Sequence, residues 1–271
     1  MSGKVRLMID FIKLRILNPS GVIFDLDYCV VINQKTGKPK VKPYEDPEGR
    51  YRNKTITYTY EHQGLTFQKK LVEKTFRNGK VVQNLYFEVY GSRHKYKNQG
   101  EYNFNRFIFH ELVSVISEIS IKYQLDPAQL EIVKMEFGLN IYLPITAKSY
   151  INSIKCYKRK PFSINTFKGQ GLMIVFDLKE YALKCYDKGV QNHKRHNTPK
   201  NLFRTEVDTI KKGFINSIGI YTLADLLVKD NISKLGVKLL KTHDQLIVFS
   251  GLKKGCTPKR NTMIANMRNR E

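Results

Sequence analysis

The stretch MIVFDLKEYALKCYDKG, residues 173–189, joins an apolar run typical of a β-strand to a charged end that carries a tyrosine. If that end is extended, the two-residue period of a strand places Lys184, Tyr186 and Lys188 on one face. Two ammonium groups beside a phenol favour its phenolate form and can hold a phosphate beside the oxygen. The alternative interpretation is a half-buried strand whose lysines are solvated, and the rest of the chain has to decide between the two.

The charge of the chain is its second informative feature. The 271 residues include 47 Lys and Arg against 24 Asp and Glu, which gives a formal net charge of +23. This excess is too large for an ordinary enzyme of small neutral substrates and indicates a polyanionic partner, with nucleic acid as the first candidate. The length suffices for one large domain or two modest ones.

A membrane partner is not expected. No apolar run approaches the roughly 18 residues of a membrane span, and no amphipathic anchor is found. The start, MSGKVRLMID, lacks the apolar core of a secretory signal. The four cysteines are scattered without a CxxC pair, which is typical of thiols in a reducing compartment rather than of disulfides or a zinc site.

Two basic segments are candidate DNA contacts. Residues 91–105, GSRHKYKNQGEYNFN, interleave cations with aromatic rings, which suits a phosphate backbone with bases to stack; a solvated loop is the alternative. Residues 191–200, QNHKRHNTPK, are basic without periodicity. The candidate DNA-binding residues in the two segments are Arg93, His94, Lys95, Lys97 and Arg195.

Turn signals and apolar periodicity place several elements. His62-Gln63-Gly64 and Asn78-Gly79 predict two hairpin turns among three strands, at 55–60, 67–75 and 81–90. Residues 109–123 have apolar side chains at helical spacing and predict a helix.

Two further predicted strands carry carboxylates. The strand over residues 131–143 places four residues on one face, namely Lys134, Glu136, Gly138 and Asn140. Glu136 is a metal-ligand candidate if it faces a cleft, and an exposed strand carboxylate otherwise. The strand over residues 203–209 places three polar side chains on one face, namely Arg204, Glu206 and Asp208.

Five stretches follow the order and spacing of a known family. They are MIDFIKLRI, FEVYGSRHKYKNQGEYN before a helix, IVKMEFGLNI before a helix, YALKCYDKG, and FRTEVDTIKKGFINSIGIYTLADLL. Through them the chain resembles the rolling-circle replication initiators of filamentous bacteriophages and, more distantly, those of plasmids. The resemblance covers residues 8–228, and it suggests a catalytic nicking domain over 1–228 with a basic C-terminal extension over 229–271.

The resemblance implies an α+β fold of the Rep-type nicking endonucleases, with a mainly antiparallel central sheet and helices packed on one face. It implies a metal-dependent, site-specific endonuclease. A tyrosine attacks one strand at the origin and keeps the 5′ phosphate as an ester, and the freed 3′ hydroxyl primes synthesis. The implied partners are origin DNA, single-stranded or melted, together with host helicase and polymerase. The implied location is the cytoplasm of a bacterial host cell.

Carried over residue by residue, the nucleophile motif of the family falls on Tyr186 and Lys188. Its acidic positions fall on Glu88, Glu136 and Glu206, whose hard oxygen ligands suit Mg²⁺ or Mn²⁺. Lys184 and Arg204, which flank these motifs, are further DNA-binding candidates.

Two departures from the family pattern matter. Where the family shows Gly-His-Asn, this chain reads Gly100-Glu101-Tyr102-Asn103, so the histidine that the resemblance implies as a metal ligand is missing. Where the family has a second tyrosine, this chain has Phe214. Tyr221 competes as a nucleophile because it lies at a predicted helix start, although its surroundings resemble a segment packed on the core.

Other function classes stay open at this level. The alternative is a non-catalytic, sequence-specific DNA-binding protein or a degenerate initiator, and a third class is an RNA-binding structural protein. Carboxylates more than about 8 Å apart would favour either over the nuclease, since a shared ion needs ligand oxygens at roughly 2–2.6 Å.

Overall fold

The computed structural model describes residues 7–17, 40–167 and 170–249. Contacts within the chain divide it into two compact units. Ile9–Glu136 and Lys211–Ile232 form one unit, which we call the Glu88 unit. The other unit, which we call the Tyr186 unit, consists of Phe137–Ile210, the described residues from Ser233 on, and the described residues up to Met8.

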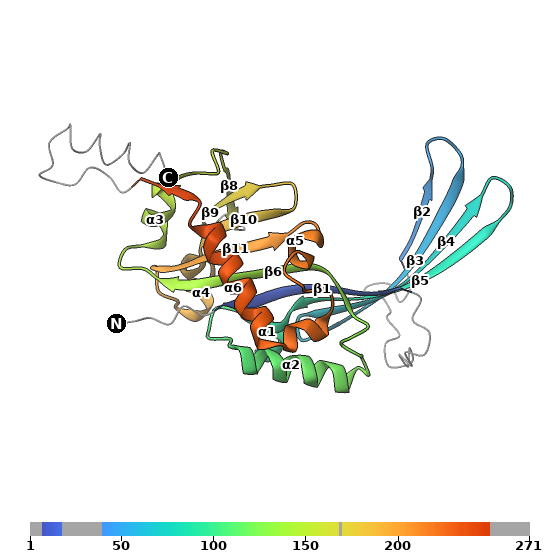
Figure 1. The fold of residues 1–271 in the computed structure, drawn as a ribbon, viewed down its shortest axis with the longest axis horizontal. Coiled ribbons are helices and arrows are strands. Elements are labelled where there is room, and N and C mark those ends of the chain that lie inside the picture. The colour runs from blue at the N-terminus through green and yellow to red at the C-terminus, as the bar shows by residue number, and fades with distance from the viewer. Residues whose placement is uncertain (1–6, 18–39, 168–169, 250–271) are drawn as a thin grey trace, which may run out of the picture. The chain divides into compact units, whose positions relative to one another are not determined.

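The protein is α+β, with a large antiparallel sheet and a few helices (Figure 1). The predicted fold class is confirmed at that level. Every strand pair whose register is described is antiparallel. Within the described ranges, no helix is both long enough and apolar enough to cross a membrane.

The sheet of the Glu88 unit has the strand order β2-β3-β4-β5-β1. The strands are β1 (Met8–Leu17), β2 (Lys40–Glu45), β3 (Tyr51–His62), β4 (Leu65–Phe76) and β5 (Val81–Ser92). Both predicted hairpin turns are present. Gln63 and Gly64 have φ of 48° and 80°, and Gly79 has φ of 81°, the left-handed backbone that tight hairpin turns need.

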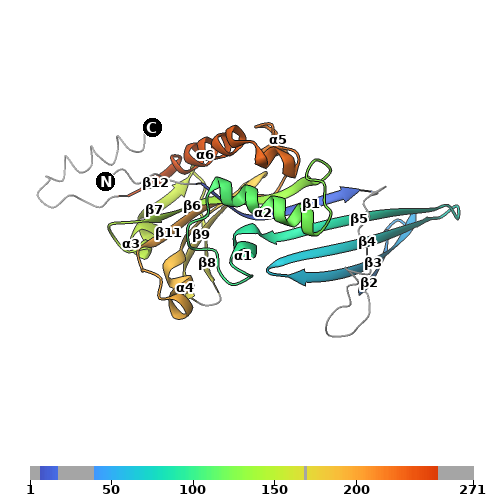
Figure 2. The ribbon, with the colours of Figure 1, turned by 90° about the horizontal axis from the view of Figure 1, so that it is seen from below.

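The helices α1 (Arg93–Lys97) and α2 (Phe109–Lys122) follow β5, and α2 lies along one face of this sheet (Figure 2). The predicted helix over 109–123 is confirmed. Its buried side chains recur at helical spacing, at Leu112, Val115, Ile116 and Ile119. Phe67 on β4 contacts Tyr123 just after α2, with ring centroids 4.4 Å apart. Two short helices, α5 (Gly213–Asn216) and η1 (Leu223–Leu227), also belong to this unit.

The Tyr186 unit has the strand order β11-β10-β9-β8. The strands are β8 (Ser163–Phe167), β9 (Gln170–Asp177), β10 (Tyr181–Asp187) and β11 (Leu202–Thr209). Every residue of β11 is buried, and so is every residue of β10 except Lys184. Residues 181–187 are therefore more buried than the alternative of a half-buried strand with solvated lysines implies, and Lys184 is the one residue of β10 that is partly exposed. The helix α3 (Ala147–Ser153) leads into β7 (Ile154–Tyr157), which pairs with β12 (Leu246–Val248).

Three elements run from one unit into the other, and the first is β1, which changes unit between Met8 and Ile9. The strand β6 (Glu131–Tyr142) changes unit between Glu136 and Phe137, and the helix α6 (Lys229–His243) changes unit between Ile232 and Ser233. The last change of unit along the chain is after Ile232, and the predicted domain boundary at 228 stays a prediction. Residues 229–248 are folded, since Leu235 and Leu239 of α6 are completely buried.

Both basic segments contain helices that the sequence analysis did not predict. In α1, Ser92 is the N-cap and its Oγ accepts a hydrogen bond from the Lys95 amide at 3.0 Å. In α4 (Lys188–His196), Asp187 caps the start by accepting from the Val190 amide at 2.8 Å. Asn197, with φ of 47°, ends α4 in the left-handed conformation. In these two segments only the capping residues indicate a helix, because there are too few apolar residues for a helical periodicity to be recognised.

Candidate functional site

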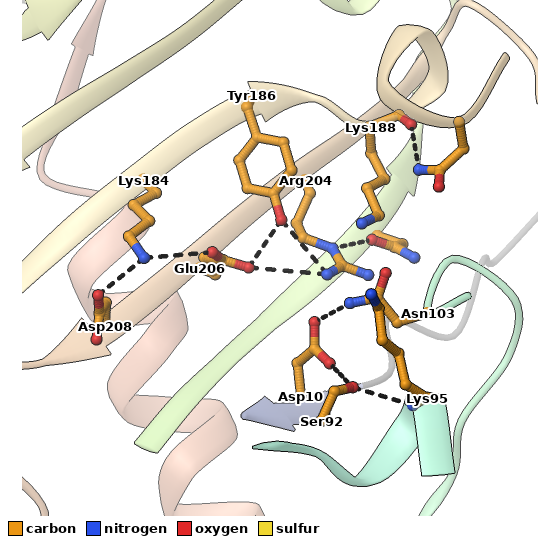
Figure 3. Close-up of polar contacts among 12 residues, drawn as sticks. Asp10, Ser92, Lys95, Asn103, Lys184, Tyr186, Lys188, Arg204, Glu206 and Asp208 are labelled. Carbon is orange, nitrogen blue, oxygen red and sulfur yellow. Dashed lines mark hydrogen bonds and ion pairs between the residues drawn. The ribbon is translucent and has the colours of Figure 1, made fainter. Parts of the chain in front are cut away.

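The register between β10 and β11 assembles the polar cluster of the Tyr186 unit (Figure 3). Tyr186 lies opposite Arg204, and Lys184 lies opposite Glu206. Paired residues of an antiparallel sheet point to the same face. The side chains predicted to share one face of β11 therefore lie on the same face of the sheet as Lys184 and Tyr186 of β10, and the charged groups of the two strands are neighbours.

The Tyr186 hydroxyl has two charged neighbours. It donates a hydrogen bond to Glu206 Oε2 at 2.9 Å, and Arg204 Nη1 donates to the phenol oxygen at 3.4 Å. The guanidinium also lies 3.8 Å from the Glu206 carboxylate. The phenol oxygen is thus between a group that can accept its proton and a permanent cation that stabilises its negative form.

Neighbouring residues hold this arrangement in place. Arg204 Nε donates to Asn140 Oδ1 on β6 at 2.6 Å, which fixes the plane of the guanidinium. Lys184 Nζ bonds Asp208 at 2.8 Å and lies 3.8 Å from Glu206. Lys184 therefore lies between two carboxylates and is held mainly by Asp208.

Space for the cluster depends on Gly138 of β6, which shares the predicted face with Asn140. A Cβ at this position would lie 2.4 Å from the Thr205 carbonyl oxygen and 2.6 Å from Glu206 Cβ. Contacts under 3 Å force the backbone to move, so only glycine lets β6 approach β11 this closely. The cluster is nearly closed to solvent, with Tyr186 8 % exposed and Arg204 1 % exposed.

Lys188 reaches the tyrosine by a different route from the predicted one. The strand ends at Asp187, and Lys188 is the first residue of α4. Its Nζ nevertheless lies over the Tyr186 ring, 5.8 Å from the centroid, and Asn192 donates to its carbonyl at 3.0 Å. Because Lys188 begins α4, the ammonium group beside the tyrosine ring comes from a helix start rather than from an extended strand. Burial raises the pKa of the carboxyl of Asp187, the residue that caps this helix.

The Glu88 carboxylate forms ion pairs with three cationic side chains. Its carboxylate, 1 % exposed, contacts Lys13 at 3.1 Å, Arg15 at 2.6 Å and Lys70. These three cations outweigh the effect of burial and lower the pKa of Glu88 from about 4.5 to about 2. Both of its oxygens are occupied by cationic donors, so the carboxylate does not fit the metal role that the resemblance implies.

The three carboxylates predicted to bind a metal ion are divided between the two units. Glu136 is half-buried on β6 and belongs with Glu88 to the Glu88 unit, whereas Glu206 belongs to the Tyr186 unit. Among the described residues, no group of three or more His, Cys, Asp and Glu side chains could hold an ion. The Mg²⁺ or Mn²⁺ site stays a prediction.

The predicted DNA contacts divide into buried and accessible residues. Arg93 and His94 are completely buried, so neither their prediction as DNA contacts nor the alternative of a solvated loop fits these two residues. Arg93 Nη1 donates to the carbonyls of Ile12 and Gly91, at 3.2 and 3.0 Å, and His94 stacks on Phe107. Three of the predicted cations in these segments are accessible to solvent, namely Lys95, Lys97 and Arg195. Lys97 forms an ion pair with Glu111, and Arg195 lies on α4.

Sequence reasoning missed a second polar cluster, around Asp10 in the Glu88 unit (Figure 3). Its carboxylate accepts hydrogen bonds from Ser92 Oγ and Asn103 Nδ2 and is nearly buried. A signal was present, because Asp10 shares the face of β1 with the apolar Ile12 and Leu14. An acid on an apolar face needs polar partners inside the fold.

The two competing nucleophile positions differ in exposure. Phe214 is buried in α5, while the Tyr221 side chain is 53 % exposed just before η1. The residues around Tyr221 do pack on the core, as predicted, since Ile220, Leu223 and Leu226 are buried, but the Tyr221 side chain itself points to solvent. Of the two tyrosines, only Tyr186 has a hydrogen bond from its hydroxyl to a carboxylate among those described.

Of the four cysteines, Cys156 and Cys185 have free thiols, as predicted, and Cys29 and Cys256 lie outside the described residues. In comparisons with known proteins, no family model matches the chain and no curated protein matches it.

Proposed function

We propose that the chain nicks and rejoins one DNA strand at a rolling-circle replication origin, with Tyr186 as the nucleophile. The observation that carries the proposal is the hydrogen bond from the Tyr186 hydroxyl to Glu206, with the Arg204 guanidinium on the same oxygen. The net charge of +23 and the order of the five motifs support DNA as the substrate.

The first step is activation of the phenol. A free tyrosine has a pKa of about 10 and is mostly protonated at neutral pH, so it needs a base or a neighbouring cation. Glu206 Oε2 is within hydrogen-bonding distance of the phenol proton and accepts it in this scheme. Arg204 keeps its charge throughout and stabilises the phenolate that forms.

The second step is transfer of the phosphoryl group. The tyrosine oxygen attacks the scissile phosphorus, a bond forms between them, and the bond from phosphorus to the 3′ oxygen breaks. The departing 3′ oxygen takes up a proton, so the number of protons is the same before and after. Positive charge from Arg204, with Lys184 and Lys188 nearby, stabilises the extra negative charge of the pentacoordinate state. Reversal of the same step rejoins the strand.

A bound Mg²⁺ or Mn²⁺ would polarise the scissile phosphate. The proton transfer and attack described above use residues of the chain alone. Host helicase and polymerase are the partners that a free 3′ hydroxyl at an origin requires, and they belong to the same proposal.

The decisive experiment is to trap the covalent intermediate. The full chain is incubated with supercoiled plasmids that carry the noncoding DNA next to its own gene, with Mg²⁺, with Mn²⁺ and with a chelator. The adduct is then digested and the peptide that carries the nucleotide is sequenced. We expect the nucleotide on Tyr186. A nucleotide on Tyr221 would refute the assignment, and it can be checked with Tyr221→Phe.

A second candidate function is DNA binding without catalysis. Two observations favour it: the small exposed fraction of Tyr186, and the lack of a metal-ligand group within the described ranges. The same experiment separates the candidates. Tight, origin-selective binding without any adduct under all three metal conditions would identify the chain as a non-catalytic binder.

A further inference from the structure

The sheet of the Glu88 unit has one face that α1 and α2 do not cover, and we call it the open face. The helices lie on the other face, where Phe67 contacts Tyr123 and His62 contacts Tyr96. The strand period and register show which residues share the open face. Lys70 and Lys74 of β4 are an even number of residues apart, so their side chains point to the same face. Tyr86 of β5 pairs with Lys70 and therefore lies on that face too.

The register extends this face to β1. Glu88 lies two residues from Tyr86 and pairs with Arg15, and Tyr90 pairs with Lys13. The side chains of Lys13, Arg15 and Lys70 are 28, 36 and 27 % exposed. Cations of β1 and β4, the two strands on either side of β5, are therefore accessible to solvent on one surface.

Each of these strands also contributes to a contact between a cation and an aromatic ring. Lys13 Nζ lies 5.8 Å from the centroid of Tyr90, and the Arg15 guanidinium lies 5.6 Å from that of Tyr86. Further along the hairpins, Lys74 Nζ lies 3.6 Å from the centroid of Tyr51. Rings and positive charges thus alternate across the open face instead of gathering in separate patches.

Glu88 holds the cations close together without cancelling their charge. One buried carboxylate contacts Lys13, Arg15 and Lys70, so three positive charges minus one negative leave an excess of two. Because those cations lower its pKa to about 2, Glu88 stays ionised at neutral pH and the arrangement is fixed before any ligand binds. An incoming group with two or more negative charges would complete the neutralisation.

Uncharged hydrogen-bonding side chains share this face with the apolar Val72, between Lys70 and Lys74, and with one further carboxylate, Glu61, whose partner Thr66 pairs with Tyr90. Thr57 pairs with Lys70, and Gln68 pairs with both Thr59 and Glu88 across the same face. Polar side chains of this kind can bond phosphate and sugar oxygens.

We propose that the open face binds single-stranded nucleic acid, with phosphates over Lys13, Arg15, Lys70 and Lys74 and unpaired bases against Tyr51, Tyr86 and Tyr90. Alternating cations and rings match a single strand, whose phosphates and unstacked bases are exposed together, whereas a duplex hides the faces of its bases. The choice of DNA over RNA as the natural ligand rests on the proposed nicking function.

The test compares two double variants that are matched in the residue types removed. Y51L/K74Q removes a ring and a cation from the open face. Y58L/K54Q removes the same residue types from β3, on the face toward α2. Binding of a fluorescent oligothymidylate to the full chain is followed by anisotropy over a range of salt concentrations. Thermal denaturation checks that both variants are folded.

We expect Y51L/K74Q to weaken binding by about 10- to 100-fold and to reduce the salt slope by about one, because it removes one stacking ring and one phosphate contact. Y58L/K54Q should change the affinity by less than about threefold, since surface charges on the other face contribute only long-range attraction. An equal loss in the two variants would refute the proposal.

A second measurement uses the unaltered chain and does not depend on variant folding. Lysine acetylation is read by mass spectrometry with and without the oligothymidylate. We expect protection of Lys70 and Lys74 but not of Lys54 and Lys69, which point to the other face. Protection of neither pair, or equal protection of both, contradicts the proposal. Equal affinity for a duplex, lost through the same substitutions, would also refute the single-strand assignment.

The outcome is separable from that of the nicking proposal, because the oligothymidylate assays need no cleavage. Protection of Lys70 and Lys74 without any covalent adduct would leave the open face supported and the nicking proposal refuted. An adduct on Tyr186 without that protection would do the reverse.

Discussion

Glu88 and Glu206 are both carboxylates on antiparallel strands with cations across from them, yet their surroundings are chemically different. Glu88 contacts three cations and no hydroxyl group among its described hydrogen bonds. Glu206 accepts the hydrogen bond of a phenol, and its cations, Lys184 and Arg204, lie farther away at 3.8 Å. The first carboxylate is saturated by positive charge, and the second keeps an oxygen for the proton of Tyr186.

The comparison teaches that the cross-strand partner, rather than the carboxylate itself, decides what a strand glutamate can do. A carboxylate bound to several cations loses proton affinity and becomes an anchor for them. A carboxylate that shares a proton with a phenol beside a guanidinium is a candidate general base. Each of the following predictions tests one side of this contrast.

The largest effect is expected for Tyr186→Phe. Removing the hydroxyl removes the proposed nucleophile, so the covalent adduct should disappear while the ring still packs in its place. Adduct formation is measured by gel shift under denaturing conditions, and oligothymidylate affinity serves as the control for folding. Persistent adduct at the wild-type level would remove Tyr186 from the mechanism.

Glu206→Gln should lower the rate of adduct formation by about 10²- to 10⁴-fold, the usual contribution of a general base. The amide keeps the size of the side chain but cannot accept the phenol proton. Asp208→Asn is the matched variant, since Asp208 contacts Lys184 and not the phenol, and we expect a loss of less than tenfold. Comparable losses in the two variants would mean that the total charge of the cluster matters rather than proton transfer.

Glu88→Gln should instead act on stability. Because the pKa of Glu88 is about 2 in the folded chain and about 4.5 ordinarily, its ionised form favours folding. That contribution is on the order of 3 kcal/mol, is fully present above about pH 4.5, and is lost as the pH falls toward 2. Chemical denaturation across this range should show a steeper loss of unfolding free energy in the wild type than in the variant. Parallel curves would contradict the pKa assignment.

The smallest effect is expected for Gly138→Ala. The added Cβ would meet the Thr205 carbonyl and Glu206 Cβ, so β6 and β11 must move apart at the cluster. Overpacking of this kind costs typically 1–3 kcal/mol of unfolding free energy. Gly236→Ala in α6 is the control, because nothing lies within 4 Å of its added Cβ. A loss in Gly138→Ala no larger than in the control would show that the approach of the strands is not tight.

Local signals in the sequence were enough for much of the fold. Hairpins were readable from turn residues that tolerate positive φ, such as Gly64 and Gly79, and α2 from its apolar spacing. The shared face of Arg204, Glu206 and Asp208 followed from the period of a strand. These features depend only on residues close together in the chain.

Features that depend on distant residues could not be predicted. Nothing local to Glu88 reveals that Lys13, Arg15 and Lys70 converge on it, because the register of three strands brings them together. Burial of Arg93 and His94 depends in the same way on the carbonyl of Ile12 and on Phe107. Helix α4 was missed because its start is encoded by one capping aspartate rather than by an apolar pattern.

The division into units also has a consequence for how the chain is made. Neither unit is one continuous stretch, since the Glu88 unit is interrupted by residues 137–210 and completed only by Lys211–Ile232. During synthesis, the ribosome therefore produces most of the Tyr186 unit before the Glu88 unit has its last residues. Contacts between such distant segments form slowly because a long loop must close first. Fragments cut at Glu136 or Ile210 would each lack part of a core, so neither unit can complete its fold until its separate segments have all been made.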